Sequence, residues 1–397
     1  MKKARFSGDS TKNIHAGNKP EFPVGAINPP IYASSTFVFP DVTVGANRFA
    51  FKEKGTIYSR WGNPTVDALE EKLAAMEGAG GAIALASGMC AITSLFYHFL
   101  QQGSEVIVHT ALYGGTFNFL ANMIGKFGVR VHFVDFQDLA RVEKLINKKT
   151  KLLYFETPTN PLMQVIDIKA VAELGRKYKI VTVLDNTFAP PPIQRPLKLG
   201  IDIVVHSLTK YINGHSDVIA GAIMGSQMQI DAIRKQTTFF LGGTMSPFTA
   251  FLVSRGMATL IARLDRHNYN AEKVVEFLDN HPKVETVYYP GLVTHKNHDI
   301  AASQMNGGYG GVLAFVLKGG YRAGRGLMEH VQMIRLAVSL GGVESLIEHP
   351  ASMTHSEYSK KEREKAGIYD GLVRLAVGLE YAEDIVSDLR HALVMIK

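Results

Sequence analysis

The sequence predicts an α/β fold in which a mainly parallel sheet is covered by helices on both faces. Between residues 82 and 206, short apolar segments alternate with segments whose apolar residues have helical spacing. Continuous apolar strands separated by helices are typical of parallel sheets that are buried on both faces. Beyond residue 247 a long helical pattern replaces this alternation, and a second group of strands follows. We therefore predict a large α/β domain and a smaller α+β domain at the C-terminal end.

The first predicted helix begins near residue 63, after an irregular arm of about 55 residues that is rich in proline and glycine. Asn63 is a candidate N-cap, Pro64 suits the first helical position, and Gly78 suits the helix end. The strands predicted for the large sheet are 82–86, 105–109, 130–134, 151–155, 181–184 and 203–206. The helices predicted between them are 89–101, 116–126, 139–147 and 168–178. The C-terminal part is predicted to contain a helical pattern at 247–271, strands at 286–289, 312–317, 334–339 and 372–377, and a helix at 384–396.

The composition is that of a globular protein with more than one core. The 397 residues exceed the usual size of a single core, and 46% of them are hydrophobic. No apolar stretch reaches the roughly 18 residues of a membrane span, and the basic start of the chain is not followed by the apolar segment of a secretion signal. The single cysteine, Cys90, excludes an intramolecular disulfide. These features predict a cytoplasmic protein without a membrane partner.

The net charge of +7 does not by itself indicate nucleic acid as a partner. The basic residues occur in small clusters rather than along one stripe, and the chain has no zinc-finger or RNA-binding signature. Anionic small molecules suit such a charge distribution better.

A lysine and an aspartate just past the ends of two apolar strands indicate a pyridoxal-phosphate site. Asp185 closes the strand that begins at residue 181, and Lys210 follows the strand that ends at residue 206. In open parallel sheets, ligands bind beyond the carboxyl ends of the strands. The lysine amine forms a Schiff base with the cofactor aldehyde, and the carboxylate pairs with the protonated pyridine nitrogen. The alternative for Asp185 alone is an aspartate that caps the following turn.

The phosphate of such a cofactor needs donors nearby, and two segments offer them. Ser207 and Thr209 carry hydroxyl groups beside Lys210. Gly88 and Met89 open a helix directly after a strand, where free amide groups bind anions. The alternative for this second segment is a serine N-cap, Ser87, with no ligand.

Two further side chains are candidates for contact with the ring or the substrate. Tyr113 lies between a strand end and a helix, where it is suited to stack on the ring or to act in acid–base chemistry. Its alternative role is that of a loop aromatic closing the core. Arg374 lies within an apolar strand and needs an anionic partner, for which a substrate carboxylate and a structural ion pair are the alternatives.

Other classes of site fit the sequence less well. Ser207 and Lys210 also match the Ser-x-x-Lys motif of β-lactamase-like hydrolases, but the two accompanying motifs are missing and the serine follows a strand instead of opening a helix. Cys90 has no evident base to pair with, and is better explained as a small core residue. The histidines show no spacing of metal ligands, so no catalytic metal is predicted.

Nearly the whole chain resembles the trans-sulfuration family of pyridoxal-phosphate enzymes of cysteine and methionine metabolism. The motifs that carry the resemblance are Tyr58-Ser59-Arg60-x-x-Asn63-Pro64-Thr65, Ala86-Ser87-Gly88-Met89, Glu156-Thr157-Pro158-Thr159-Asn160-Pro161, Asp185-Asn186-Thr187, His206-Ser207-x-Thr209-Lys210-Tyr211, Ser339-Leu340-Gly341-Gly342-x-Glu344-Ser345 and Arg374-x-x-x-Gly378-x-Glu380. The resemblance implies an aminotransferase-like fold of type I with a mainly parallel seven-stranded sheet. It also implies three regions: an arm over 1–62, a cofactor-binding domain over 63–256 and a C-terminal domain over 257–397.

The resemblance also implies a role for each matching residue. Lys210 would hold the cofactor and move protons between substrate carbons, Asp185 would pair with the pyridine nitrogen, and Tyr113 would stack on the ring. The phosphate would be held by Gly88, Met89, Ser207 and Thr209. The substrate carboxylate and the cofactor edge would be held by Asn160, Ser339 and Arg374. Tyr58 and Arg60 resemble residues that reach the phosphate of a neighbouring subunit, which implies sites shared across a dimer and a homotetramer made of two dimers.

The implied reaction is γ-elimination from cystathionine or methionine, which yields 2-oxobutanoate, ammonia and a thiol. The alternative is γ-replacement on an O-acylhomoserine, as in cystathionine γ-synthases and sulfhydrylases, because the same groups serve both reactions. Three segments look most like methionine γ-lyases: residues 37–51, the region of Lys318-Gly319-Gly320, and residues 349–356. Those enzymes usually carry a cysteine where this chain has Gly115, and glycine there is similar to cystathionine γ-lyases and γ-synthases.

Overall fold

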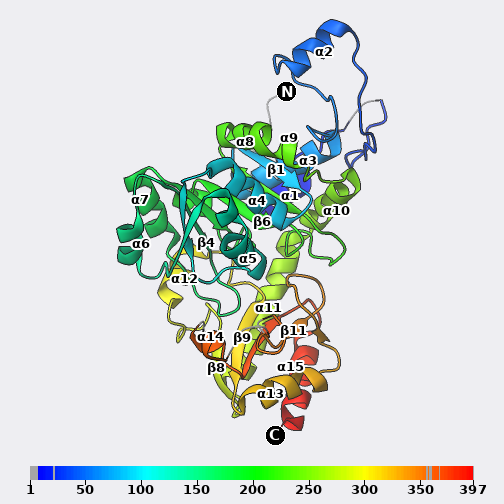
Figure 1. The fold of residues 1–397 in the computed structure, drawn as a ribbon. Coiled ribbons are helices and arrows are strands. Elements are labelled where there is room, and N and C mark those ends of the chain that lie inside the picture. The colour runs from blue at the N-terminus through cyan, green and yellow to red at the C-terminus, as the bar shows by residue number, and fades with distance from the viewer. Residues whose placement is uncertain (1–7, 21–22, 355, 357–359, 366, 397) are drawn as a thin grey trace.

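We describe the fold from a computed structural model of the chain. The structure describes residues 8–20, 23–354, 356, 360–365 and 367–396, so residues 1–7 and 21–22 of the predicted arm lie outside it. The molecule contains two sheets, which lie one after the other along its length. The N-terminal segment lies at one end of the molecule and the C-terminus at the other (Figure 1). No helix of the described residues has the length and apolar composition needed to cross a membrane.

The larger sheet has seven strands in the order β1-β7-β6-β5-β4-β2-β3. Its strands are β1 (Gly81–Leu85), β2 (Glu105–His109), β3 (Arg130–Val134), β4 (Thr150–Glu156), β5 (Val181–Asp185), β6 (Ile203–Ser207) and β7 (Gly221–Gly225). Strands β3, β2, β4, β5 and β6 pair in parallel, whereas β7 is antiparallel to both of its neighbours. The prediction of a mainly parallel seven-stranded sheet is therefore confirmed.

Helices cover both faces of this sheet, as the continuous apolar strands require. One face packs against α4 (Gly88–Phe99), α5 (Gly114–Asn122) and α8 (Gln227–Ile233). The other face packs against α6 (Leu139–Leu145) and α7 (Ile168–Tyr178), and further along against α3 (Pro64–Glu77) and α10 (Pro247–Ala258). Short turns of helix complete this part at η1 (Ile124–Phe127), η2 (Pro196–Leu199), η3 (Arg234–Thr238) and α9 (Phe239–Leu241).

The predicted ends of α3 are confirmed by its capping contacts. The Asn63 side chain accepts a hydrogen bond from the backbone N–H of Thr65 at 3.0 Å, and Pro64 is the first helical residue. Gly78 ends the helix in the left-handed conformation, with φ of 77°.

The smaller sheet has five strands in the order β10-β11-β12-β9-β8. Its strands are β8 (Val284–Tyr288), β9 (Val312–Leu317), β10 (Arg335–Leu336), β11 (Leu346–Glu348) and β12 (Leu372–Ala376), and the helices nearby are α12 (His298–Gln304), α13 (Gly320–His330), α14 (Lys360–Lys365) and α15 (Ala382–Met395). The long helix α11 (Leu260–Asp279) joins the two parts: its first turns pack in the core of the large domain, and its later turns pack under the small sheet. The domain boundary at 256/257 stays a prediction.

Several sequence predictions about individual elements were wrong. The strand β7 was missed because it is bounded by glycines that weaken a strand signal, and β11 was missed because it has only three residues. The helical pattern 247–271 is two helices that meet at Thr259, and only Arg335–Leu336 of the predicted strand 334–339 pairs.

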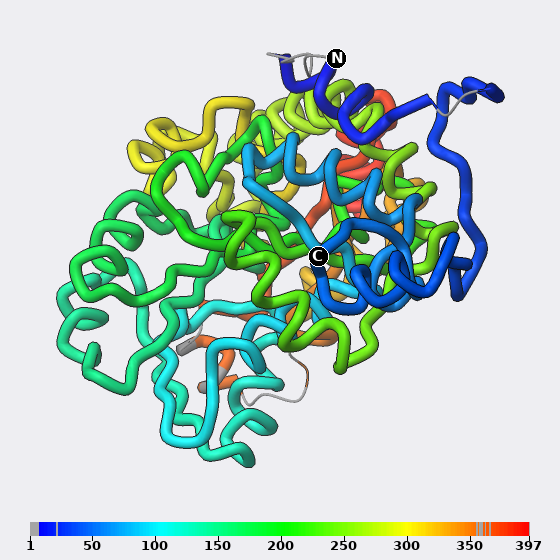
Figure 2. The backbone as a smooth tube through the Cα atoms, turned by 90° about the horizontal axis from the view of Figure 1, so that it is seen from above, coloured from blue at the N-terminus to red at the C-terminus, as the bar shows by residue number. Residues whose placement is uncertain are grey.

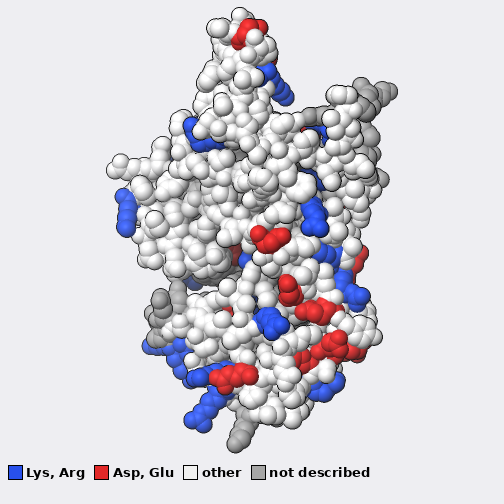
Figure 3. Space-filling model, turned by 90° about the vertical axis from the view of Figure 1, so that its right-hand side faces the viewer, with Lys and Arg blue, Asp and Glu red and all other residues white. Residues whose placement is uncertain are grey.

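The predicted irregular arm contains two short helices, α1 (Asp9–His15) and α2 (Val42–Phe49). Helix α1 is joined to the body by an ion pair of 2.6 Å between Asp9 and Arg195. Helix α2 projects from the body, and the chain before it runs along the outside (Figures 1 and 2). On the face drawn in Figure 3, basic side chains lie interspersed with acidic ones.

Candidate active site

Several of the predicted site residues lie at or just beyond the carboxyl ends of the neighbouring parallel strands β5 and β6, beside the end of β4. Glu156, Asp185 and Ser207 are the last residues of these strands, and Asp185 is in register with Glu156 on one side and with Val205 on the other. Because the strands run in the same direction, their carboxyl ends form one edge, where ligands bind in open α/β sheets.

Lys210 lies in the turn that follows β6, and its amine is mostly buried. Its Nζ donates a hydrogen bond of 2.6 Å to Oγ of Ser339, which comes from the smaller domain. Burial, followed by the positive charge of Arg374, lowers the pKa of Lys210 to about 8, while Glu348 acts in the opposite direction. The neutral amine, which a nucleophile or a proton acceptor requires, therefore forms at a lower pH than it does for an ordinary lysine.

Asp185 is held by Thr187, a residue that the sequence reasoning quoted in a motif without giving it a role. The backbone N–H and the hydroxyl of Thr187 both donate to Oδ1 of Asp185, at 3.0 and 2.5 Å. The same hydroxyl accepts from the backbone N–H of Ser207 at 2.8 Å, so it connects the ends of β5 and β6. Burial raises the pKa of Asp185, and the bonds from Thr187 lower it. Both bonds use Oδ1, and neither uses Oδ2.

A close approach of backbones forms a cradle next to Ser207. Ser87 caps α4 by accepting from the backbone N–H of Cys90 at 3.0 Å. A Cβ on Gly88 would lie 3.0 Å from Cβ of Ser207, and a Cβ on Gly221 would lie 2.2 Å from the carbonyl oxygen of Ser87. Only glycine allows the approach at residue 221, and a Cβ at residue 88 would make a tight contact. The cradle thus brings the free amide groups of the first turn of α4 to the end of β6, a setting that suits a phosphate.

The two hydroxyl groups predicted to bind phosphate differ in their surroundings. No hydrogen bond recorded for the described residues uses the hydroxyl of Ser207. The hydroxyl of Thr209 bonds to the backbone of Ala220 in both directions, donating to the carbonyl at 3.2 Å and accepting from the N–H at 3.0 Å. Ser207 is therefore the hydroxyl that is ready to donate.

The predicted carboxylate-binding residues form a connected cluster around Arg374. Its guanidinium donates to Oδ1 of Asn160 at 3.0 Å and to the backbone oxygen of Ser339 at 2.9 Å. Ser339 has a φ of 90°, which is unusual for a residue with a side chain. These residues come from three separate parts of the chain, and only the fold brings them together.

Glu348 completes this cluster, and the sequence reasoning missed it. Its Oε1 lies 2.9 Å from Nη1 of Arg374, and both side chains are buried. Burial lowers the pKa of Arg374, and the Glu348 carboxylate raises it. The available signal was a glutamate in the apolar segment Leu346–Glu348, because a buried carboxylate needs a cationic partner. The structural ion pair considered for Arg374 is thus present, and Nε of Arg374 remains without a partner among the described residues.

Tyr113 lies at the start of α5 with its ring about half exposed. Its backbone N–H donates to Oε1 of Glu156 at 2.8 Å. A Cβ on Gly115 would lie 2.6 Å from the Tyr113 ring and 3.1 Å from Sδ of Met89. The absence of a side chain at residue 115 therefore lets the ring of Tyr113 lie over this turn.

Tyr58 and Arg60 are not joined to the other site residues. The Arg60 guanidinium lies 5.7 Å from the centre of the Tyr58 ring and donates to the carbonyl of Phe239. No hydrogen bond or ion pair recorded within the described ranges connects either residue to Lys210 or Asp185. The fold of a single chain thus leaves this predicted pair away from the group at the sheet edge.

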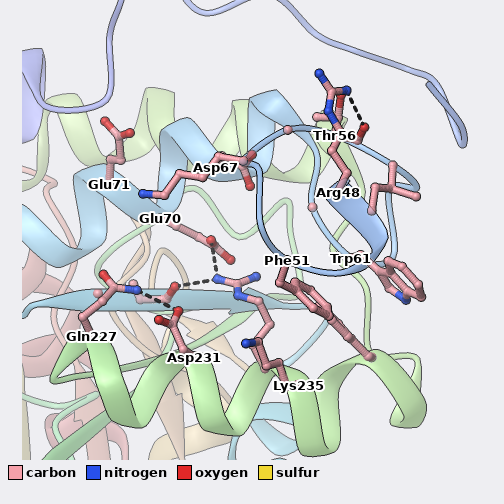
Figure 4. A pocket seen from close by; sticks show the side chains of 18 of the residues that line it. Arg48, Phe51, Thr56, Trp61, Asp67, Glu70, Glu71, Gln227, Asp231 and Lys235 are labelled. Atoms are coloured by element: carbon pink, nitrogen blue, oxygen red, sulfur yellow. Dashed lines mark hydrogen bonds and ion pairs between the residues drawn. The ribbon is translucent and has the colours of Figure 1, made fainter. Parts of the chain in front are cut away.

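A cavity of about 480 Å³ lies apart from these residues, between the segment before α3, the outer face of α3 and the helix α8 (Figure 4). A partly buried ion pair of 2.6 Å between Glu70 and Arg234 forms part of its wall. Glu70 accepts from the backbone N–H of Ala84, and Arg234 donates to the carbonyl of Ala82. The ion pair therefore provides hydrogen-bond partners for backbone groups at the free edge of β1. Protection of this sheet edge explains why the two charged side chains are present.

The fold and the site define a class of protein: an α/β enzyme that binds pyridoxal phosphate at the edge of its large sheet. The arrangement fits that cofactor, because a buried carboxylate oxygen, a partly neutral lysine amine and a cradle of backbone amides meet at one edge. No group of His, Cys, Asp and Glu side chains that would hold a metal ion is found among the described residues.

Comparison with known proteins gives the family. The model of the Cys/Met metabolism PLP-dependent enzymes matches residues 10–394, and the chain belongs to this family. The chain is 48% identical to an L-methionine γ-lyase of Fusobacterium nucleatum subsp. polymorphum over 98% of both chains. It is 44% identical to a cystathionine γ-synthase of Mycobacterium bovis, over 98% of this chain and 97% of the relative. A solved cystathionine γ-lyase of Lactobacillus plantarum in complex with L-serine is 39% identical and superimposes with a TM-score of 0.92, covering 98% and 99% of the two chains.

The family predicted from the motifs is thus confirmed, and with it the enzymatic nature of the protein and its cofactor, pyridoxal 5′-phosphate. The predicted fold class is confirmed as well.

Proposed function

We propose that the protein catalyses γ-elimination from sulfur amino acids, with methionine and cystathionine as the substrates to test first. Methionine and water would yield methanethiol, 2-oxobutanoate and ammonia. The observation that carries the proposal is the bond between Lys210 and Ser339, which places an amine with a pKa of about 8 beside the buried Arg374. Relatives named L-methionine γ-lyase at 46 to 48% identity support it.

The cofactor would be held at four points. Lys210 would bond to its aldehyde carbon, and Asp185 would face the ring nitrogen. Tyr113 would lie against the ring. The phosphate would be held by Gly88, Met89, Ser207 and Thr209. When bound, the cofactor withdraws electrons from the substrate carbons, so that loss of a proton beside the amino group becomes feasible.

The residues of the chain would supply substrate binding and proton transfer. The guanidinium of Arg374 and the amide of Asn160 would bind the carboxylate of the amino acid, and the backbone oxygen of Ser339 would orient the guanidinium. Once the substrate amine has displaced it, Nζ of Lys210 would accept the proton from the α-carbon and deliver protons to neighbouring carbons. The phenol of Tyr113 would donate a proton to the leaving sulfur.

We also propose that active sites are shared in a homotetramer of two dimers. Tyr58 and Arg60 of each chain would reach the phosphate site of a neighbouring subunit. Their separation from Lys210 within one chain supports this proposal, as does the projecting segment around α2 (Figure 1). A cytoplasmic location remains a prediction.

One substrate panel tests the proposed reaction. The purified protein is incubated with methionine, homocysteine, cystathionine and an O-acylhomoserine, with and without a thiol, and is scored for 2-oxobutanoate and for thioether products. We expect 2-oxobutanoate from a γ-thioether substrate in the wild-type protein, and none from the Lys210→Ala variant. The alternative is γ-replacement, favoured by Gly115 and by relatives named cystathionine γ-synthase. Thioether formation from O-acylhomoserine without release of 2-oxobutanoate would establish it instead.

The shared site has a separate test. The Arg60→Ala variant is expected to lose cofactor on dialysis several times faster than the wild-type protein, because a phosphate contact from the neighbouring subunit is removed. An unchanged rate of cofactor loss would contradict shared sites.

A further inference from the structure

Glu156 lies between two side chains assigned to the cofactor, but has no role of its own in the reaction described above. It ends β4, is 4% exposed, and is in register with Asp185 at the end of β5. Two carboxyl groups in neighbouring register positions at a buried edge repel each other when both are ionised. A carboxyl group is therefore costly at this position, and its contacts indicate what it does.

The first contact of Glu156 fixes the start of α5. Tyr113 is the N-cap residue of this helix, and its own side chain makes no capping hydrogen bond. Oε1 of Glu156 accepts from the backbone N–H of Tyr113 at 2.8 Å. The ring of Tyr113 is about half exposed, so packing alone does not define where it lies. The hydrogen bond from the Tyr113 backbone to Glu156 on β4 fixes the position of this residue.

The second contact of Glu156 is electrostatic and involves Asp185. Burial, followed by the charge of Asp185, raises the pKa of Glu156 well above its ordinary value. Asp185 is favoured as the anion, because Thr187 donates two hydrogen bonds to it and His206 on β6 also lowers its pKa. Tyr154, on the same face of β4, has its pKa raised by burial and then by both carboxyl groups, so its phenol stays neutral. Glu156 therefore carries the proton of the pair.

We propose that Glu156 is a positioning residue that ties the backbone of Tyr113 to the strand end carrying Asp185. It thereby holds the aromatic ring and the partner of the cofactor nitrogen in one fixed relation. This inference depends on the roles proposed above for Tyr113 and Asp185. A carboxyl group suits the task because its protonated form accepts from the Tyr113 N–H without adding a second negative charge beside Asp185.

Two substitutions of Glu156 distinguish its role as a hydrogen-bond acceptor from any effect of its charge. Glu156→Gln keeps an acceptor oxygen for Tyr113 and mimics the protonated acid, whereas Glu156→Met keeps the side-chain length and removes the acceptor. The matched control is Glu105→Met: Glu105 is also buried, but it lies at the opposite end of the sheet, at the start of β2, where it accepts from Asn147 at 2.8 Å. Each variant is purified as the cofactor-loaded enzyme, and its cofactor content is measured. Visible circular dichroism of the bound cofactor then reports the ring environment, and kcat/KM is measured for 2-oxobutanoate release.

The glutamine variant is expected to keep the dichroic signal and a kcat/KM within about threefold of wild type. The methionine variant is expected to bind cofactor with an altered dichroic signal and to lose roughly 10- to 100-fold in kcat/KM, because small displacements of a positioning group have effects of that size. The Glu105 control is expected to keep the dichroic signal. If the methionine variant does not fold, Glu156→Ala takes its place with the same expectation.

Two results would overturn the proposal. One is a methionine variant with an unchanged dichroic signal and rate, and the other is a glutamine variant that loses as much as the methionine variant. Measurements on the wild-type protein distinguish a failure of the role proposed for Glu156 from a failure of the proposed function. A wild type without cofactor absorbance or keto-acid release refutes both, whereas an active wild type with an unaffected methionine variant refutes only the role of Glu156.

Discussion

Replacing Gly115 by alanine and by cysteine tests how the ring of Tyr113 is held at the mouth of the site. A Cβ at residue 115 would lie 2.6 Å from Cε1 of Tyr113, where an ordinary contact is 3.4 to 4 Å. It would also lie 3.1 Å from Sδ of Met89. The ring must therefore move by about 1 Å, and because it is half exposed it can swing toward solvent. We expect the free energy of unfolding to fall by less than about 1 kcal/mol, below the 1 to 3 kcal/mol typical of overpacking in a rigid core.

The effect on catalysis is expected to be larger than the effect on stability. A catalytic group displaced by 1 Å costs on the order of 100-fold in rate. The alanine and cysteine variants add the same Cβ, so displacement of Tyr113 predicts similar losses of roughly 10- to 100-fold in kcat/KM for both. Release of 2-oxobutanoate from methionine and from cystathionine is the assay, and chemical unfolding gives the stability.

The two variants also distinguish displacement of Tyr113 by the added Cβ from a specific role of a cysteine at residue 115. Methionine γ-lyases usually carry a cysteine at this position, so a specific role of the thiol predicts a gain in methionine cleavage for the cysteine variant alone. Such a gain, with the alanine variant impaired, would refute the conclusion that the Cβ displaces Tyr113. Equal losses in both variants would support it.

Three further predictions concern buried titratable side chains. Because the pKa of Lys210 is lowered to about 8, capture of pyridoxal phosphate by the apoenzyme should accelerate with pH, with a midpoint near pH 8. A midpoint above pH 10 would show an ordinary, exposed amine. Glu348→Gln should raise KM by about tenfold and lower the free energy of unfolding by about 2 kcal/mol, because the buried guanidinium of Arg374 loses its counter-ion. The control is Glu329→Gln, at an exposed ion pair with Arg325, which should change neither KM nor the free energy of unfolding. Burial lowers the pKa of His267 to about 4, so this residue binds a proton more readily in the unfolded chain than in the folded one. The contribution of His267 to the free energy of unfolding therefore falls by roughly 3 kcal/mol as the pH decreases from about 6.5 toward 4. His267→Gln should reduce the slope of that part of the curve, measured by chemical unfolding at each pH, and an unchanged slope would contradict a neutral buried imidazole.

The parts of the site that lie along single strands were predictable from the sequence. Asp185 and Lys210 follow consecutive apolar strands, and two such strands in an α/β pattern end at the same edge of a sheet. The structure places β5 and β6 side by side, as this requires. The capping residues Asn63, Pro64 and Gly78 were predictable for the same reason, because a cap depends only on its neighbours in the chain.

The sequence by itself determined the α/β pattern, the strand ends that carry Asp185 and Lys210, and the motifs of the family. Only the tertiary structure decided that β7 inserts antiparallel between β1 and β6, and that Glu348 meets Arg374. The same holds for Glu156, which meets a backbone N–H 43 residues away in sequence. Local periodicity and capping arise from residues a few positions apart, so a sequence records them directly. Contacts between distant segments depend on sheet order and register, which the whole core sets, and no local pattern in the chain specifies them.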